Sequence, residues 1–320
     1  IFYKSVLLQI WFFKFVSILI KLNHKFTNNI TFRIIVFLSL FTIFLSNNLY
    51  GDFFYFACYA LILTFGIIHG ANDVLILLKG KEVNTNTIID KTLKYFFVVV
   101  LICLIFFNLP IISLLFFILF SAYHFGEQQW TIFENNNSNS LTLFYFFFGS
   151  LIFMILFTIN SFEVSDVIYD ITSFYIPESA YGLSLSILLL INVFFLFLNY
   201  KTLKAQLFHQ LILFIVMLIV FSIFDLLPAF AVYFVFFHSI PSIIEQAEYL
   251  FEDSSAKTFK KFIFKGFAYW LVAIIFLAIL YFVVKDKIDF SLGVFFSFLA
   301  AITFPHVLVI YKMKEITRKN

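Results

Sequence analysis

Four histidines lie inside strongly apolar stretches of the chain, and their side chains are the best suited to chemistry. They are His69, His124, His238 and His306, in the segments LTFGIIHGANDVLILL, LLFFILFSAYHFGEQQW, YFVFFHSIPSIIEQ and FLAAITFPHVLVIYK. Imidazole is a ligand that suits iron, copper and zinc. A single histidine in such surroundings could simply donate to a backbone carbonyl of a neighbouring helix. Four of them favour a shared site, because ionisable groups inside membrane spans usually face a functional interior.

The composition predicts the elements that position these histidines. The 320 residues are 63% hydrophobic and only 12% charged, whereas soluble domains carry about 25% charged residues. Apolar runs near the length of a membrane helix, about 20 residues, recur along the whole chain. They lie near 5–20, 31–47, 53–78, 95–108, 110–126, 141–160, 181–199, 207–224, 228–249, 263–284 and 290–311. We therefore expect an all-α polytopic membrane bundle of about ten spans.

This bundle is expected to form one membrane domain over residues 1–320, with its helical core at 31–311. Residues 1–30 could add one further N-terminal span and a basic loop. Basic residues gather in alternate connections, which predicts that those connections and the C-terminus are cytoplasmic. The connection at 161–178 contains four acidic residues and no lysine or arginine, so it is expected outside. A net charge of +3 without a basic stripe argues against nucleic acid as a partner.

The predicted orientation brings the four apolar histidines together. All four lie on spans that run from outside to inside, ten to sixteen residues from the start of each span. Their depths then differ by roughly 9 Å at a rise of about 1.5 Å per residue. The remaining histidines, His24 and His209, fall at predicted interfaces. Cys58 and Cys103 lie in apolar runs and are interpreted as packing residues.

Polar neighbours add to the predicted site. Asp73 is four residues after His69, so on a continuous helix it would share a face with that histidine and accept from its ring N–H. Glu127, Gln128 and Gln129 follow His124 at the end of an apolar run, and at least two of them are expected to mark the water interface.

Four motifs in this order resemble those of the Brp/Blh family of bacterial membrane β-carotene 15,15′-dioxygenases. They are HGAND at 69–73, SAYHFGEQQW at 121–130, FFHS at 236–239 and TFPHVLVI at 303–310. The resemblance covers roughly residues 50–311. It implies a multi-helical membrane protein that uses non-haem Fe(II) and O2 to split the central double bond of β-carotene into two retinals.

The resemblance also implies iron ligands. Carried over by position, they are His69, His124 and His238. The family's third motif runs His-Ser-x-x-His, whereas this chain has HSIPS, so Ser242 stands at the fourth ligand position. Water, His306 or Glu245 could complete the set, or iron could have been lost.

The expected partners follow from the same resemblance. They are a carotenoid and O2, the lipid bilayer of a bacterial inner membrane, and a retinal-binding rhodopsin as acceptor of the product. Two other functions stay open on the residues alone. One is a diverged carotenoid-binding relative without catalysis, which Ser242 favours. The other is a metal or proton transporter, since intramembrane histidines and carboxylates also serve such pathways.

Overall fold

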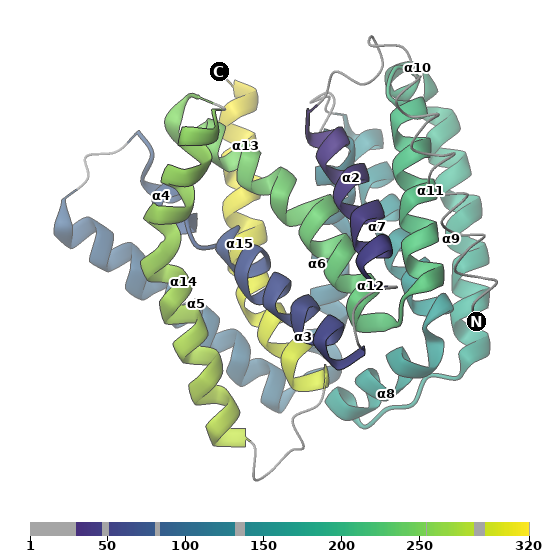
Figure 1. Ribbon diagram of the computed structural model, residues 1–320, viewed down its shortest axis with the longest axis horizontal. Helices are drawn as coiled ribbons and strands as arrows, with labels where there is room; N and C mark the ends of the chain where they lie inside the picture. The colour runs from purple at the N-terminus through teal and green to yellow at the C-terminus, as the bar shows by residue number, and fades with distance from the viewer. Residues whose placement is uncertain are drawn as a thin grey trace.

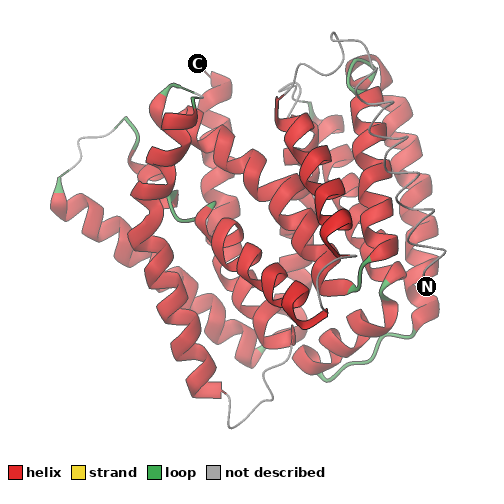
Figure 2. Ribbon diagram, in the orientation of Figure 1, coloured by secondary structure: helices red, strands yellow, loops and turns green. Residues whose placement is uncertain are grey.

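The chain folds as a bundle of helices joined by short connections (Figures 1 and 2). The computed structural model describes residues 30–46, 51–80, 84–131, 138–253, 255–284 and 292–319. No strand occurs within these ranges, and the predicted all-α class is confirmed. The predicted span at 5–20 and His24 lie outside the described residues. The helices are α2 (Ile30–Ser46), α3 (Gly51–Leu61), the π-helix η1 (Ile62–Gly66), α4 (Asp73–Leu78), α5 (Thr85–Asn108), α6 (Pro110–Thr131), α7 (Asn139–Ile159), α8 (Ser161–Thr172), α9 (Glu178–Leu198), α10 (Tyr200–Leu203), α11 (Leu207–Ile223), α12 (Leu226–Val232), the π-helix η2 (Tyr233–Ser239), α13 (Ile240–Phe251), α14 (Ala256–Val284) and α15 (Leu292–Lys319).

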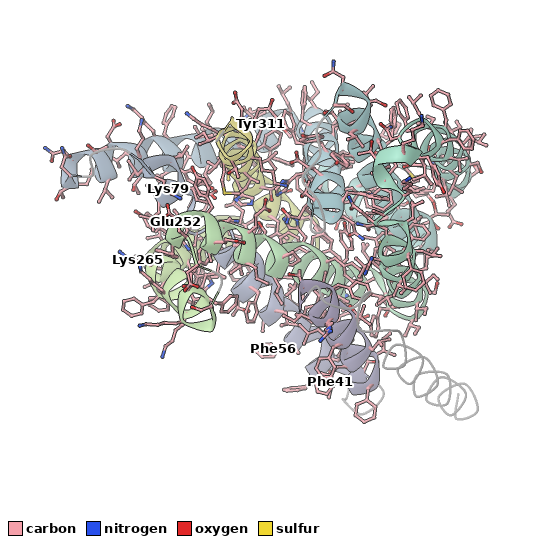
Figure 3. All side chains as sticks on the ribbon, turned by 90° about the horizontal axis from the view of Figure 1, so that it is seen from above. Phe41, Phe56, Lys79, Glu252, Lys265 and Tyr311 are labelled. Atoms are coloured by element: carbon pink, nitrogen blue, oxygen red, sulfur yellow. The ribbon has the colours of Figure 1, made fainter. Side chains whose placement is uncertain are left out.

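Six helices of the described chain are long and apolar enough to cross a membrane, and three apolar helices are shorter. The six lie at Pro110–Thr131, Asn139–Ile159, Glu178–Leu198, Leu226–Phe251, Lys257–Ile279 and Gly293–Thr317. Large apolar side chains such as Phe41 and Phe56 project from the molecule (Figure 3) and are 42% and 67% exposed. An outward apolar surface of this kind suits lipid rather than water.

The helix at Leu226–Phe251, made of α12, η2 and α13, is the centre of the bundle. It is the most buried of the six long helices described. Helices α3, α7 and α11 contact its first part, α2, α6 and η1 contact η2, and α4 and α14 contact α13. Any side chain that η2 directs inward is therefore enclosed by protein on every side.

The predicted continuous span at 53–78 is broken in the structure, which corrects the sequence interpretation. Helix α3 passes into the π-helix η1, residues 69–72 form turns, and α4 starts again at Asp73. In the turn, the N–H of Gly70 bonds to the carbonyl of Ile67, three residues back. The side chain of Asn72 donates to the carbonyl of Phe262 on α14 and so fixes the turn to a neighbouring helix. The turn at Gly70 and this long-range hydrogen bond therefore break the helix that the continuous apolar pattern predicted.

The connection predicted at 161–178 contains a helix, α8, over Ser161–Thr172. Its buried residues include Val164 and Ile168, while acidic side chains occupy its other faces. Glu163 accepts a hydrogen bond from the N–H of Leu226, at the start of α12. The acidic residues were typical of a loop, but they belong to an amphipathic helix that covers one end of the bundle.

Helices α6 and α7 approach each other closely through two glycines. A methyl group built on Gly126 would overlap the carbonyl oxygen of Tyr145, and one built on Gly149 would overlap the carbonyl oxygen of Ala122. Backbone sits against backbone here, so neither glycine can be replaced without moving a helix. This contact lies close to a candidate site residue, because Gly126 is two residues after His124.

We expect Gly126→Ala to lower the thermal unfolding temperature of the detergent-solubilised protein, because the added methyl group forces α6 and α7 apart. Overpacking of this kind costs about 1–3 kcal/mol. Gly182→Ala is the matched control, since a Cβ there meets nothing within 4 Å. Equal unfolding temperatures for the two variants would contradict the close contact.

Candidate metal centre

The four apolar histidines come from four separate parts of the chain and meet inside the bundle. His69 follows η1, His124 lies on α6, His238 on η2 and His306 on α15. Their exposed fractions are between 1% and 6%. The α3–α4, α12–α13 and α15 segments run in the same direction (Figure 1), so similar positions along them reach one level. The predicted convergence of these histidines is confirmed.

The imidazole rings form a closed circle. Ring centroids are 4.5 Å apart for His69 and His306, and 4.7 Å apart for His124 and His238. The circle is completed by 5.1 Å between His69 and His238 and 5.4 Å between His124 and His306. Neighbouring rings are close to perpendicular, with interplanar angles of 78° to 86°.

Three of these histidines could hold a metal ion. His69, His238 and His306 each offer one ring nitrogen, and the three nitrogens lie within 4.8 Å of one another. His124 is not in this group of three, although its ring lies beside those of His238 and His306. The structure therefore brings His306 into the cluster as closely as the histidines that the family resemblance implies.

The hydrogen bonds leave the ring nitrogens of this cluster open. Among the described residues, Nε2 of His124, Nε2 of His306 and both ring nitrogens of His238 are buried without a hydrogen-bond partner. His69 donates through Nδ1 to the carbonyl of Gly66, which leaves its Nε2 as an acceptor. A buried polar atom without a partner costs about 1–3 kcal/mol. Buried imidazole nitrogens without a partner fit a metal ion, which would bind one nitrogen of each ring.

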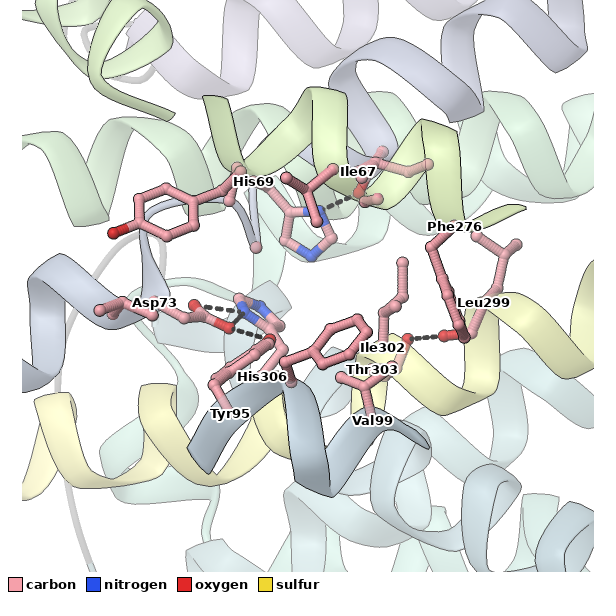
Figure 4. A pocket seen from close by; sticks show the side chains of 18 of the residues that line it. Ile67, His69, Asp73, Tyr95, Val99, Phe276, Leu299, Ile302, Thr303 and His306 are labelled. Carbon is pink, nitrogen blue, oxygen red and sulfur yellow. Dashed lines mark hydrogen bonds and ion pairs between the residues drawn. The ribbon is translucent and has the colours of Figure 1, made fainter. Parts of the chain in front are cut away.

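Asp73 orients His306, not His69 (Figure 4). Nδ1 of His306 lies 2.9 Å and 3.1 Å from the two carboxylate oxygens of Asp73. Tyr95 donates to the same carboxylate at 2.7 Å. The predicted pairing with His69 was wrong because turns at 69–72 remove the shared helical face. A carboxylate that accepts a hydrogen bond from Nδ1–H fixes the tautomer and leaves Nε2 of His306 free to bind a metal.

The other predicted substitute ligands make different contacts. Ser242 is fully buried, and its hydroxyl oxygen accepts a hydrogen bond from Gln246 at 2.8 Å. Glu245 accepts from Gln128 at 3.0 Å and lies 3.9 Å from the ammonium of Lys314. Within the described chain, neither residue belongs to the histidine group.

A buried ionic layer lies beside the histidines in the direction of the C-terminal end of α15. Lys314 forms an ion pair with Glu127 at 3.4 Å, and both side chains are 2% exposed. Lys314 also donates to Thr131 at 3.1 Å. Glu127, Gln128 and Gln129 are all buried, so their predicted place at the water interface was wrong. Their partners come from α11, α13 and α15, which a linear sequence does not place beside them.

Sequence reasoning missed Lys314, although a usable signal exists. It lies eight residues after His306, and Glu127 lies three residues after His124. Residues at these spacings share a helical face. The helical faces that carry His124 and His306 could therefore have been followed for one or two further turns, which would have predicted Glu127 and Lys314 beside the histidines.

A cavity of about 110 Å³ opens beside the cluster and is lined by His69, His306 and Asp73 (Figure 4). Its other walls are mainly apolar and come from α5, α14 and α15, through side chains such as Val99, Phe276 and Leu299. A site that accepts one water needs only about 10–15 Å³ on this scale. The cavity thus offers an apolar ligand direct access to the histidines.

The fold and the site define an α-helical bundle, with helices able to cross a membrane, in which three buried histidines beside an apolar cavity could form a metal site. Residues 60–314 match the family model of the β-carotene 15,15′-dioxygenases, and the chain belongs to this family. Neither a curated protein nor a solved structure matches the chain.

We expect Lys314→Met to lower the unfolding temperature strongly, because it leaves buried Glu127 without its ammonium partner. Removing one partner of a buried ion pair costs about 3–5 kcal/mol. The double variant Glu127→Gln/Lys314→Met removes both charges and should recover most of the loss. A single variant as stable as the unmodified protein would show that the ion pair contributes little.

Proposed function

We propose that this protein cleaves β-carotene, or a related carotenoid, at its central double bond with O2 to give retinal. The observation that carries the proposal is the circle of four buried histidines, with open ring nitrogens, beside an apolar cavity. Membership of the β-carotene 15,15′-dioxygenase family supports the same reaction. The proposed metal is Fe(II), since imidazole ligands and open positions are typical of iron sites that use O2.

The proposed ligands are His69, His124, His238 and His306. Ser242 stands where the family resemblance implies a histidine, and His306 supplies the fourth imidazole instead. Its ring is held by Asp73, which in turn accepts from Tyr95. Bound iron would supply activation of O2 next to the double bond.

The protein side chains position the substrate and keep water away. A carotenoid dissolved in the bilayer reaches the cavity sideways, between α5 and α14. The cavity is lined on this side by residues of both helices, which are Thr92, Phe96, Tyr269 and Phe276. Apolar walls then hold the polyene against the histidines and exclude water, which would otherwise compete for the open positions.

We place the protein in a bacterial inner membrane, with the C-terminus cytoplasmic and a retinal-binding rhodopsin as acceptor of the product. The apolar outer surface supports the membrane location. The C-terminal orientation rests on the distribution of basic residues, and the bacterial membrane and the acceptor rest on the family.

We expect His69→Ala and His306→Ala each to abolish retinal formation in a bacterial host that accumulates β-carotene, because each removes a proposed ligand. Retinal is measured by chromatography of cell extracts, and iron by elemental analysis of the purified protein. His209→Ala is the matched control, since His209 packs against Phe32, away from the cluster. Retinal output from His306→Ala equal to that of the control would remove His306 from the proposed site. An unmodified protein that contains iron and forms no retinal would support a carotenoid-binding relative without catalysis.

We expect Asp73→Asn to weaken metal affinity by about 10- to 100-fold, the usual effect of losing a partner that orients a metal-binding histidine. The measurement is a titration of the metal-free protein with Co(II), followed by its visible absorption. Tyr95→Phe keeps the carboxylate and should have a smaller effect. Unchanged affinity in Asp73→Asn would show that this carboxylate does not orient a ligand.

A further inference from the structure

We propose that a second apolar cavity, between α6, α7, α8 and α12, binds one end of the carotenoid while the cavity at His69 and His306 holds the other arm. This inference rests on the proposed function. It identifies the groups that would place the central double bond of a long substrate at the histidines.

The second cavity, of about 50 Å³, has only apolar side chains in its wall. They include Phe117 and Ile118 of α6, Phe157 of α7, Ile168 of α8 and Phe230 of α12. A cavity with such walls stays dry and accepts apolar ligands. Its position under α8 also gives that amphipathic helix a function, as the cover of a binding site.

On each of two sides, a pair of stacked aromatic rings lies between this cavity and the histidines. On one side, the ring centroid of Phe234 lies 5.5 Å from that of His69. Phe234 is also stacked on Phe230, a residue of the second cavity, with their ring centroids 5.2 Å apart. On the other side, the ring centroid of Phe125 lies 4.3 Å from that of His238. Phe125 is also stacked on Phe153, another residue of the cavity wall, with their ring centroids 5.4 Å apart.

The ring of Phe234 occupies space that is available only because residue 66 is a glycine. The ring of Phe234 lies against Gly66, where a Cβ would meet it at 2.7 Å. Phe234 also lines the first cavity. Rotation of Phe234 and Phe230 would therefore join the two cavities into one apolar channel past the histidines.

The two cavities are bounded by helices from different parts of the bundle. The first is bounded by α5 and α14, and the second by α7 and α8, which occupy the left and right parts of Figure 1. Helix α15 contributes to both, with Leu299 in the first and Phe296 in the second. Cleavage at the centre of a polyene requires space for both arms, and two cavities with separate walls would give each arm its own.

The test is to fill the second cavity without touching the first. Ile118→Trp adds an indole at a half-buried position in its wall. The matched control is Ile112→Trp, on the same helix but 48% exposed on the outer surface. Val167→Phe fills the same cavity from α8 and serves as a second variant. Thermal unfolding shows which variants are folded.

Two substrates are compared. One is β-carotene, and the other is a shortened carotenoid that keeps one ring and one full arm but has the other arm cut back to an aldehyde. We expect Ile118→Trp to lower kcat/KM for β-carotene at least tenfold and to change that for the shortened substrate less than twofold. The Ile112→Trp control should change neither value.

Binding without turnover separates this inference from the proposed function. Chelator-treated protein is incubated with β-carotene in detergent, and the bound pigment is measured by its absorption. Ile118→Trp should bind several-fold less β-carotene than Ile112→Trp. Equal binding by the two variants, or an equal loss of activity on both substrates, would overturn the second cavity as a binding site. An unmodified protein that binds β-carotene in this way but cleaves neither substrate would refute the reaction alone.

Discussion

The cost of burying polar and ionisable groups away from water is the constraint on which this structure depends. Histidines, carboxylates and an ammonium lie inside a bundle whose outer surface is apolar, and each needs a partner of matching chemistry. Asp73 with His306, and Glu127 with Lys314, meet that requirement through residues more than 180 positions apart. These pairs fix α15 to α4 and α6, and thereby fix the position of His306 relative to the other histidines.

Irregular helix geometry follows from the same constraint. Two π-helical segments, η1 and η2, lie beside or contain His69 and His238. A π-helical turn shifts the side chains that follow it around the helix, and such turns occur often at functional sites. At η1, the shift leaves the carbonyl of Gly66 to accept from His69. A regular helix would have directed the same apolar sequence differently and left the rings apart.

The sequence was sufficient for the helical class and for the convergence of the histidines, because span length and direction set both. It was insufficient where a contact joins distant helices. The partner of Asp73 was misassigned because apolar periodicity does not show the break at 69–72. Glu127 was placed in water because Lys314 lies 187 residues later in the chain. Helix α8 was read as a loop, since its charges conceal the apolar face that covers the bundle.

The ionic layer also bears on the charge of the proposed metal. Four neutral imidazoles leave a divalent ion with its full charge in a medium of low dielectric constant, where compensation is strongly favoured. Glu127 and Glu245 against Lys314 leave one negative charge, and Asp73 adds a second. Together they match the charge of Fe(II), although none of them needs to be a ligand. The same residues that satisfy one another in the bundle would therefore also compensate the charge of the proposed metal.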